Sequence, residues 1–193
     1  MAKIVLASGS PRRQELLNRI GITDFDIRVP EAEETYPEGL TPQQVVEHLS
    51  RKKADAAMAL CHGDEIVITA DTMVFLDDQR LGKPADEADA LRMLTALQGR
   101  HHTVCTGVTV RQGDRSLTQC ETTEVYFRTA TERELLGYIA TGEPMDKAGA
   151  YGIQGGAALF AEKMVGDYYN VMGLPVCRLW QLLRAAAPEL LNA

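Results

Sequence analysis

The chain has 193 residues, of which 45% are hydrophobic and 24% charged, as is ordinary for a soluble globular protein. It contains no low-complexity tract or internal repeat, which excludes disordered and repeat architectures. Its formal net charge of −7 argues against a nucleic-acid polymer as partner, because such binders present a basic stripe. A phosphate-bearing ligand would therefore be bound locally by Lys and Arg side chains, and the excess of carboxylates suggests that a divalent cation mediates the contact.

Cysteine usage and hydropathy indicate a cytoplasmic protein that contacts no membrane. The cysteines are scattered without a C-x-x-C pair, which favours reduced thiols over a disulfide frame or a zinc site. They are Cys61, Cys105, Cys120 and Cys177. The apolar run at the N-terminus is too short for a signal peptide, and no run approaches the ~20 apolar residues of a membrane-spanning helix.

The chain opens with a short apolar run, residues 3–7, that leads directly into the string SGSPRR. Ser10 is a typical N-cap and Pro11 suits the first position of a helix, so we expect a helix to begin there with its N–H groups exposed. Arg12 and Arg13 fall in the first turn, where the helix dipole disfavours cations. The segment therefore predicts a bound anion, with an exposed arginine pair on a capped helix as the alternative.

Hydrophobic periodicity and turn signals predict alternating helices and strands along the rest of the chain. Capping boxes at Thr41 and Thr131 begin two helices, and residues 111–114 form a hairpin turn. The expected helices cover about 11–20, 42–60, 86–98, 131–139 and a segment after Pro175. The expected strands cover 25–29, 65–70 with an extension over 73–76 toward an Asp77-Asp78 turn, 102–110, 117–127 and 159–164.

No linker divides this alternation of strands and helices, and one hairpin lies at its centre. We therefore expect a single α/β domain over residues 1–193. Its predicted architecture is a mixed, curved β-sheet flanked by helices, with two lobes around a central cleft.

Asp71 is the candidate catalytic residue because it follows an apolar strand, and ligands of α/β sheets usually bind at strand ends. Thr72 beside it offers a hydroxyl and an N–H. The alternative for Asp71 is a carboxylate that caps a turn. The histidines receive no catalytic role, since His101 and His102 are adjacent and would face opposite sides of a strand.

Two lysines and a glutamine in loops are candidate ligand contacts. Lys83 and Lys147 lie beside glycines, where they can reach phosphates, although solvated loop lysines are the alternative. The amide of Gln154 offers both a donor and an acceptor, which suits the N3–H and O4 edge of uracil or thymine. A plain turn glutamine is the alternative.

Three segments occur in one order along the chain: residues 7–13, then 70–72 with 82–84, then 146–155 with 166–175. Together they resemble the Maf family of nucleoside triphosphate pyrophosphatases. The similarity extends from about residue 4 to residue 180, and the ten-residue string DKAGAYGIQG is its most specific part.

This resemblance implies an enzyme that hydrolyses dTTP and UTP to the monophosphate and diphosphate in nucleotide-pool clean-up, and activity on modified pyrimidine nucleotides stays open. Asp71 takes the position of the family's general base. Arg12, Thr72 and Gln154 take the positions that set base preference, and this combination resembles the dTTP/UTP branch. A sister branch that acts on 7-methyl-GTP differs in the segment ending at Gln154.

The resemblance also implies residues that hold the phosphates and a divalent cation, Mg²⁺ or Mn²⁺. The phosphate-binding lysines are Lys53, Lys83 and Lys147, and Ser8, Arg12 and Arg13 complete the substrate-binding set. Asp71 and Glu33 take the metal-ligand positions, although Glu34 beside Glu33 leaves the register open. A metal-assisted attack of water is favoured, because a carboxylate of ordinary pKa is a weak base.

Two other functions stay open. One is a nucleotide-binding regulator of cell division and septum formation without turnover, against which Asp71 argues. The other is a kinase, against which the lack of a G-x-x-x-x-G-K-[ST] loop argues. Whether the chain forms a homodimer is also open.

Overall fold

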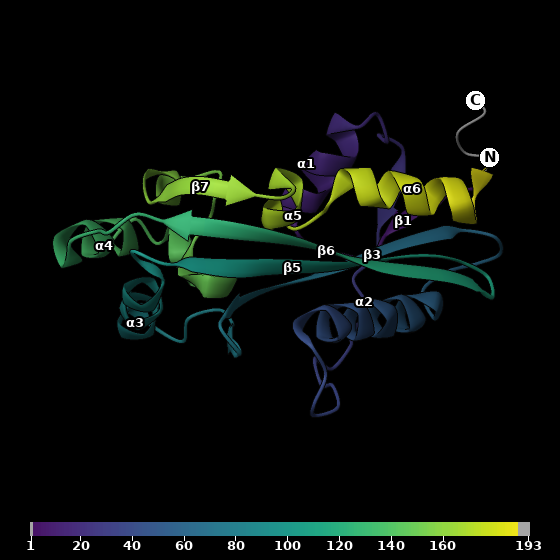
Figure 1. Ribbon diagram of the computed structural model, residues 1–193. Coiled ribbons are helices and arrows are strands. Elements are labelled where there is room, and N and C mark those ends of the chain that lie inside the picture. The colour runs from purple at the N-terminus through teal and green to yellow at the C-terminus, as the bar shows by residue number, and fades with distance from the viewer. Residues whose placement is uncertain (1, 189–193) are drawn as a thin grey trace. The chain divides into compact units, whose positions relative to one another are not determined.

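The computed structural model describes residues 2–188, along which strands and helices alternate (Figure 1). The strands are β1 (Ile4–Leu6), β2 (Phe25–Ile27), β3 (Ile66–Leu76), β4 (Gln79–Leu81), β5 (His101–Gln112), β6 (Arg115–Phe127) and β7 (Ala161–Val165). The α-helices are α1 (Pro11–Arg19), α2 (Pro42–Met58), α3 (Glu87–Leu97), α4 (Glu132–Ile139), α5 (Tyr168–Met172) and α6 (Val176–Ala186). Short 3₁₀ turns are η1 (Glu143–Asp146), η2 (Ala148–Ala150) and η3 (Gly156–Leu159). The predicted helices and strands are confirmed to within a few residues, whereas β4 and α5 were not predicted.

The capping interactions predicted at the starts of the helices are confirmed for two helices and differ for a third. Both capping boxes form: Thr41 accepts from the Gln44 N–H while Gln44 accepts from the Thr41 N–H, and Thr131 pairs with Glu134 in the same way. The expected cap of α1 is wrong in one respect, because the Ser10 hydroxyl makes no capping hydrogen bond. The turn is closed instead by the Ser8 hydroxyl, which accepts from the Ser10 N–H at 3.3 Å.

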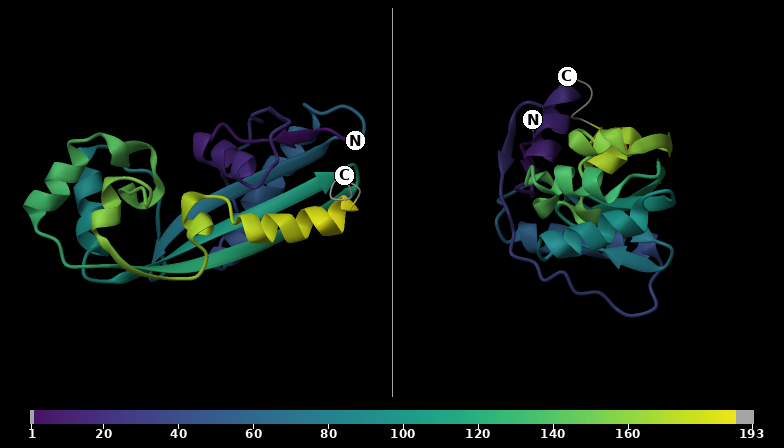
Figure 2. Two further views of the ribbon diagram at one scale, coloured as in Figure 1. Left: turned by 90° about the horizontal axis from the view of Figure 1, so that it is seen from above. Right: turned by 90° about the vertical axis from the view of Figure 1, so that its left-hand side faces the viewer.

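The strands form a seven-stranded mixed sheet in the order β2-β1-β3-β5-β6-β7, with β4 paired to β3 (Figures 1 and 2). β1 runs parallel to both β2 and β3, whereas β3–β4 and β6–β7 are antiparallel. The predicted Asp77-Asp78 turn joins β3 to β4, and Asp77 adopts a φ of 52° there. The expected mixed sheet flanked by helices is therefore confirmed.

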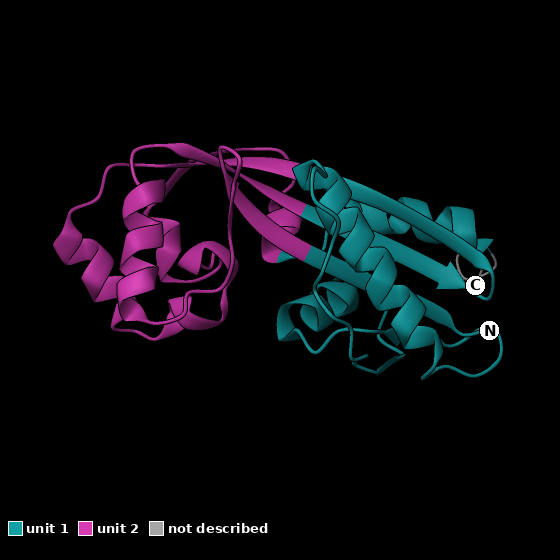
Figure 3. Ribbon diagram, turned by 90° about the horizontal axis from the view of Figure 1, so that it is seen from below, with its two compact units in different colours: residues 1–71, 106–121, 173–193 teal, residues 72–105, 122–172 magenta. Residues whose placement is uncertain are grey.

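The chain divides into two compact units whose boundaries fall inside the long strands β3, β5 and β6 (Figure 3). Unit 1 comprises Met1–Asp71, Thr106–Glu121 and Gly173–Ala193, and unit 2 comprises Thr72–Cys105 and Thr122–Met172. The single domain and the cleft expected from the sequence stay predictions.

In unit 1, α2 covers one face of the sheet, and α1 and α6 cover the other (Figure 1). Val5, Ala7 and Val67 form a buried cluster with Ala57 of α2. On the opposite face, Arg178 of α6 donates to the carboxylate of Glu121 on β6 at 2.9 and 3.1 Å. These contacts hold both helical layers against the sheet that carries the site described below.

Gly107 of β5 lies directly against the backbone of α2. A Cβ at this position would lie 2.2 Å from the Val46 carbonyl oxygen and 2.7 Å from the Glu47 nitrogen, both backbone atoms of α2. We expect Gly107→Ala to lower the free energy of unfolding by about 3 kcal/mol, because the helix must move away from the strand. Urea unfolding measures this loss. Gly137→Ala on α4 is the matched control, since that Cβ meets nothing within 4 Å and should stabilise the helix.

Unit 2 packs around an aromatic cluster. His102 is 1% exposed, its Nε2 lies 2.7 Å from the Tyr151 hydroxyl, and its ring meets Phe127 edge to face at 4.9 Å. His101, its neighbour on β5, is exposed and stacks on Tyr126. The expectation that the two histidines face opposite sides of a strand is therefore confirmed.

Burial lowers the pKa of His102 to about 3, with the neighbouring His101 charge as a second cause. Below pH ~6.5 the unfolded chain binds a proton at this histidine that the folded chain does not, so stability falls as the pH falls. We expect His102 to reduce the free energy of unfolding by about 2 kcal/mol between pH 7 and pH 5. Urea unfolding at both pH values measures this difference. His102→Gln should remove that part of the pH dependence, and an unchanged dependence would contradict the assignment.

Across residues 2–188, no helix is both long enough and apolar enough to cross a membrane. Cys61, Cys105, Cys120 and Cys177 all carry free thiols, which confirms the expectation of unpaired cysteines.

Candidate functional site

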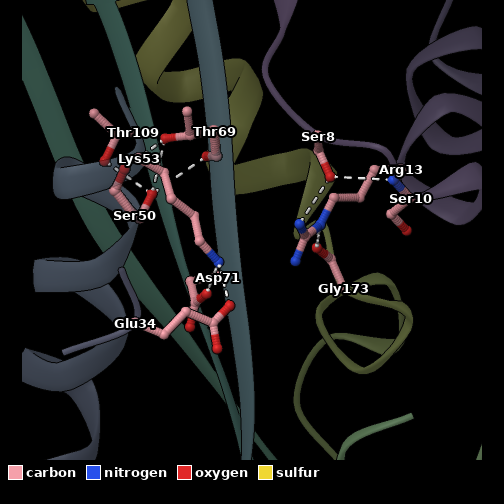
Figure 4. Close-up of polar contacts among 10 residues, drawn as sticks. All are labelled: Ser8, Ser10, Arg13, Glu34, Ser50, Lys53, Thr69, Asp71, Thr109 and Gly173. Atoms are coloured by element: carbon pink, nitrogen blue, oxygen red, sulfur yellow. Dashed lines mark hydrogen bonds and ion pairs between the residues drawn. The ribbon is translucent and has the colours of Figure 1, made fainter. Parts of the chain in front are cut away.

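Asp71 lies in the middle of β3 and not, as the sequence predicted, at a strand end, because the strand continues without a break to Leu76. It is the last residue of unit 1 on this strand, and its carboxylate is almost completely buried, with 4% of the residue exposed. Its Oδ1 accepts a hydrogen bond from the ammonium of Lys53 (Figure 4). Its Oδ2 is also buried but has no hydrogen-bond partner among the described residues. Since an unsatisfied buried carboxylate oxygen is costly, this atom marks a place where a ligand, ion or water is expected to bind.

Lys53 of α2 joins Asp71 to the acidic loop that precedes the helix. Its Nζ lies 3.1 Å from Glu34 Oε1 as well as against Asp71. The adjacent Lys52 donates to the Thr35 hydroxyl at 2.7 Å, so successive lysines hold successive loop residues. Glu33 lies in the same loop and is exposed.

A buried group of hydroxyls sets the position of Lys53 relative to Asp71. The Ser50 hydroxyl lies 2.9 Å from Thr109 Oγ1 and 3.2 Å from Thr69 Oγ1, and Thr69 donates to the Ser50 carbonyl at 2.7 Å. Ser50 precedes Lys53 by one helical turn, and Thr69 precedes Asp71 by two strand residues. Fixing α2 to β3 at Ser50 and Thr69 therefore places the lysine beside the carboxylate.

Arg13 forms the second part of the site (Figure 4). Its Nε donates to the Gly173 carbonyl at 2.8 Å and its Nη1 to the Ser8 hydroxyl at 3.0 Å. Burial lowers the pKa of this guanidinium, while the negative charges of Asp71 and Glu34 act in the opposite direction. Arg13 thus lies within electrostatic range of both carboxylates. Arg12 is half-buried on the same turn of α1.

The remaining predicted site residues belong to unit 2. They are Thr72, Lys83, Lys147 and Gln154. Lys83 and Gln154 are exposed, and Thr72 is half-buried. Lys147 donates to the Glu143 carbonyl at 2.7 Å and to the Asp146 carboxylate at 2.8 Å, which makes it part of its own loop.

Comparison with known protein families identifies the family of this chain. The model of the family described as Maf-like protein matches residues 3–186. The chain belongs to the Maf family. A Bacillus cereus relative named dTTP/UTP pyrophosphatase is 48% identical over 184 residues, which cover 95% of each chain. One of the same name from Pelotomaculum thermopropionicum is 50% identical, covering 95% of this chain and 96% of that one.

The same fold occurs in a solved structure of a HAM1 protein from Coxiella burnetii. It is 14% identical and matches with a TM-score of 0.50, covering 96% of this chain and 100% of that chain. At this identity the likeness concerns the fold alone.

The Maf motifs pointed to Ser8, Arg13, Lys53 and Asp71, which unit 1 brings together. Sequence reasoning missed the residues that hold these side chains, namely Ser50 and Thr69. Two signals were available in the sequence: Ser50 lies one helical turn before Lys53, and Thr69 lies two residues before Asp71. Gly173 lies in the segment 166–175 that the resemblance includes, but its contact with Arg13 was not predicted, because a backbone acceptor 160 residues away has no side-chain identity.

The oxygen donors of this Maf site suit a hard divalent cation. Within residues 2–188, no group of three His, Cys, Asp or Glu side chains is placed to hold a metal ion. Two carboxylates, Asp71 and Glu34, nevertheless meet at Lys53, and Asp71 Oδ2 has no hydrogen-bond partner. Mg²⁺ is commonly held by one or two carboxylates together with waters and substrate phosphates, so the donors present fit such an ion.

Proposed function

We propose that this chain hydrolyses dTTP and UTP to the monophosphate and diphosphate. A water oxygen bonds to the α-phosphorus, and the bond from that phosphorus to the oxygen bridging toward the β-phosphate breaks. The observation that carries the proposal is Asp71, whose buried carboxylate contacts Lys53 through Oδ1 and has an unsatisfied Oδ2. Curated relatives that share about half of the sequence over nearly the whole length support the substrate.

Arg13 and Ser8 would bind the phosphates. The contacts to Gly173 and Ser8 fix the orientation of the guanidinium before substrate arrives, so little side-chain freedom is lost on binding. A guanidinium matches the geometry of phosphate oxygens and stays charged at neutral pH. Lys53 adds a second positive charge beside Asp71. These charges offset the negative charge of the departing diphosphate.

Asp71 would orient the attacking water and accept its proton. Its Oδ1 is engaged by Lys53, which leaves the buried Oδ2 as the oxygen that faces the water. The Ser50 and Thr69 hydroxyls keep this geometry by fixing α2 against β3. Such positioning converts a random encounter with water into an aligned attack.

A divalent cation, Mg²⁺ or Mn²⁺, would be held by Asp71 and by a glutamate of the acidic loop. Bound there, it supplies Lewis acidity toward the phosphate oxygens and toward water. We favour Glu34 over Glu33 as the second ligand, because both are exposed but Glu34 contacts Lys53 beside Asp71.

In this proposal Gln154 reads the base, with Arg12 and Thr72 as the other positions that set preference. Gln154→Glu replaces the amide donor with an acceptor that faces O4 of uracil. We expect kcat/KM for UTP to fall about 10- to 100-fold relative to CTP, which presents an amino group at that edge. The UTP to CTP ratio is the measurement, and Gln43→Glu on α2 is a charge-matched control. An equal ratio in wild type and variant would remove Gln154 from base recognition.

The proposed function is tested by incubating the purified chain with a panel of canonical and modified nucleoside triphosphates and a divalent cation. We expect release of diphosphate, with UTP and dTTP among the best substrates. Binding of UTP without any release would instead support the regulator without turnover. The free cysteines suit a reducing compartment, which supports a cytoplasmic location.

A further inference from the structure

The loop that carries Gln154 in unit 2 is folded around one carboxylate that no sequence motif singled out, that of Glu143. We propose that Glu143 is a positioning residue for pyrimidine recognition, because it fixes the backbone on both sides of Gln154. The inference rests on the proposed reading of the base by Gln154.

Two hydrogen-bonded connections bracket Gln154. Glu143 Oε2 accepts from the Gly156 N–H at 2.9 Å, two residues after Gln154. Glu143 Oε1 accepts from the Tyr138 hydroxyl at 2.9 Å, and that hydroxyl in turn accepts from the Gly152 N–H at 3.0 Å, two residues before Gln154. One carboxylate and one phenol of the α4–η1 segment therefore hold the loop at positions 152 and 156.

The glycines of the loop provide a second, steric argument. A Cβ at Gly155 would lie 2.2 Å from Glu143 Oε1 and 2.4 Å from Oε2. A Cβ at Gly152 would lie 2.9 Å from the same Oε1 and 2.7 Å from Lys147 Cε. A side chain at either position would therefore displace the Glu143 carboxylate or the end of Lys147. Glycine at 152 and 155 allows the backbone to lie directly against Glu143.

Tyr138 connects Glu143 to the Gly152 side of the loop, and its own position is fixed by packing. Its ring packs edge to face on Phe160, with the centroids 5.6 Å apart, and it is 6% exposed. Burial, reinforced by Glu143, raises the pKa of Tyr138, so the phenol keeps its proton and donates to the carboxylate at neutral pH. Lys147 donates to the Glu143 carbonyl at 2.7 Å and thereby fixes the start of the loop.

The hydrogen bonds from Glu143 and Tyr138 to the loop form a frame around Gln154. This frame matters because Gln154 itself is exposed and its side chain retains freedom. The geometry with which it meets a base must therefore come from the backbone that carries it. Holding residues 152 and 156 in place fixes the backbone position from which the Gln154 amide reaches uracil or thymine, so less order has to be imposed on binding. Loosening the frame should weaken discrimination between bases more than it weakens turnover.

The test compares kcat/KM for UTP and CTP in wild type, Glu143→Ala, Tyr138→Phe and Gln154→Glu. We expect Glu143→Ala to lower the UTP to CTP ratio about tenfold and Tyr138→Phe to lower it less, because the phenyl ring keeps its packing. Glu162→Gln on β7, an exposed glutamate of the same unit, is the control and should leave the ratio unchanged. An equal loss for both nucleotides would indicate a merely structural role and overturn the inference.

Gln154→Glu distinguishes failure of the inference about Glu143 from failure of the proposed base reading by Gln154. If it changes the ratio and Glu143→Ala does not, the inference fails and base reading by Gln154 stands. If neither changes the ratio, both fail. If Glu143→Ala does not fold, Tyr138→Phe decides, and an unchanged ratio in that variant overturns the inference.

A double-mutant cycle tests the steric argument directly. Gly155→Ala alone should lower the UTP to CTP ratio, because its methyl group displaces the Glu143 carboxylate. In the Glu143→Ala background, the same methyl group meets no carboxylate and should have no further effect. Additive effects of the two substitutions would contradict the close contact.

Discussion

Replacing Asp71 with Asn is expected to lower kcat for UTP and dTTP by at least about 1000-fold while nucleotide binding survives. The amide has the same shape but cannot accept the proton of the attacking water. It also removes the negative charge that lies against Lys53 and within range of Arg13. Arg13 and Lys53 keep their positive charges toward the phosphates, so the affinity for the nucleotide should not fall.

Release of diphosphate measures turnover, and calorimetric titration with a non-hydrolysable UTP analogue measures binding. Asp24→Asn, an exposed aspartate of unit 1, is the matched control and should retain wild-type activity. A thermal melt of each variant verifies folding. Turnover of Asp71→Asn within about tenfold of wild type would remove this carboxylate from the mechanism.

Removing divalent cations is expected to silence the enzyme, and Mg²⁺ or Mn²⁺ should restore it. The chain carries a formal net charge of −7 and its proposed substrate is also strongly acidic, so the two repel without a cation between them. The carboxylates of Asp71 and Glu34 meet at Lys53, where they provide hard oxygen donors for such an ion. Full activity after rigorous chelation would contradict this expectation.

The neighbouring glutamates allow the metal ligand to be assigned by a matched pair. We expect Glu34→Gln to raise the Mn²⁺ concentration needed for half-maximal activity about tenfold or more, and Glu33→Gln to leave it nearly unchanged. Electron paramagnetic resonance of Mn²⁺ with the protein alone measures binding without turnover. The opposite pattern would assign Glu33 as the ligand and return to the register first expected from the sequence.

The sequence determined those features that depend on residues close together in the chain. Thr41 with Gln44 and Thr131 with Glu134 form their capping boxes because each pair spans a single helical turn. Strand and helix periods, with turn residues between them, likewise predicted most elements and the mixed sheet. β4 and α5 have three and five residues and were missed, whereas the equally short β2 was predicted from a longer run of strand-forming residues, 25–29.

The sequence also named most of the candidate site. Asp71 was predicted from the apolar run before it, although it lies inside β3, the SGSPRR segment pointed to Ser8 and Arg13, and the resemblance supplied Lys53. Only the tertiary structure decided how they are held. The Ser8 hydroxyl, and not the predicted Ser10 hydroxyl, accepts the hydrogen bond in the turn before α1, and Glu34 rather than Glu33 contacts Lys53.

The contacts that complete the site join residues far apart in the chain. The separation is 160 residues for Arg13 and Gly173, and 59 residues for Ser50 and Thr109. No local pattern encodes such a contact, because it forms only when α2 packs on the sheet and the C-terminal segment returns beside α1. The sequence by itself therefore predicted which groups carry the chemistry, and packing between distant segments decided their partners and their geometry.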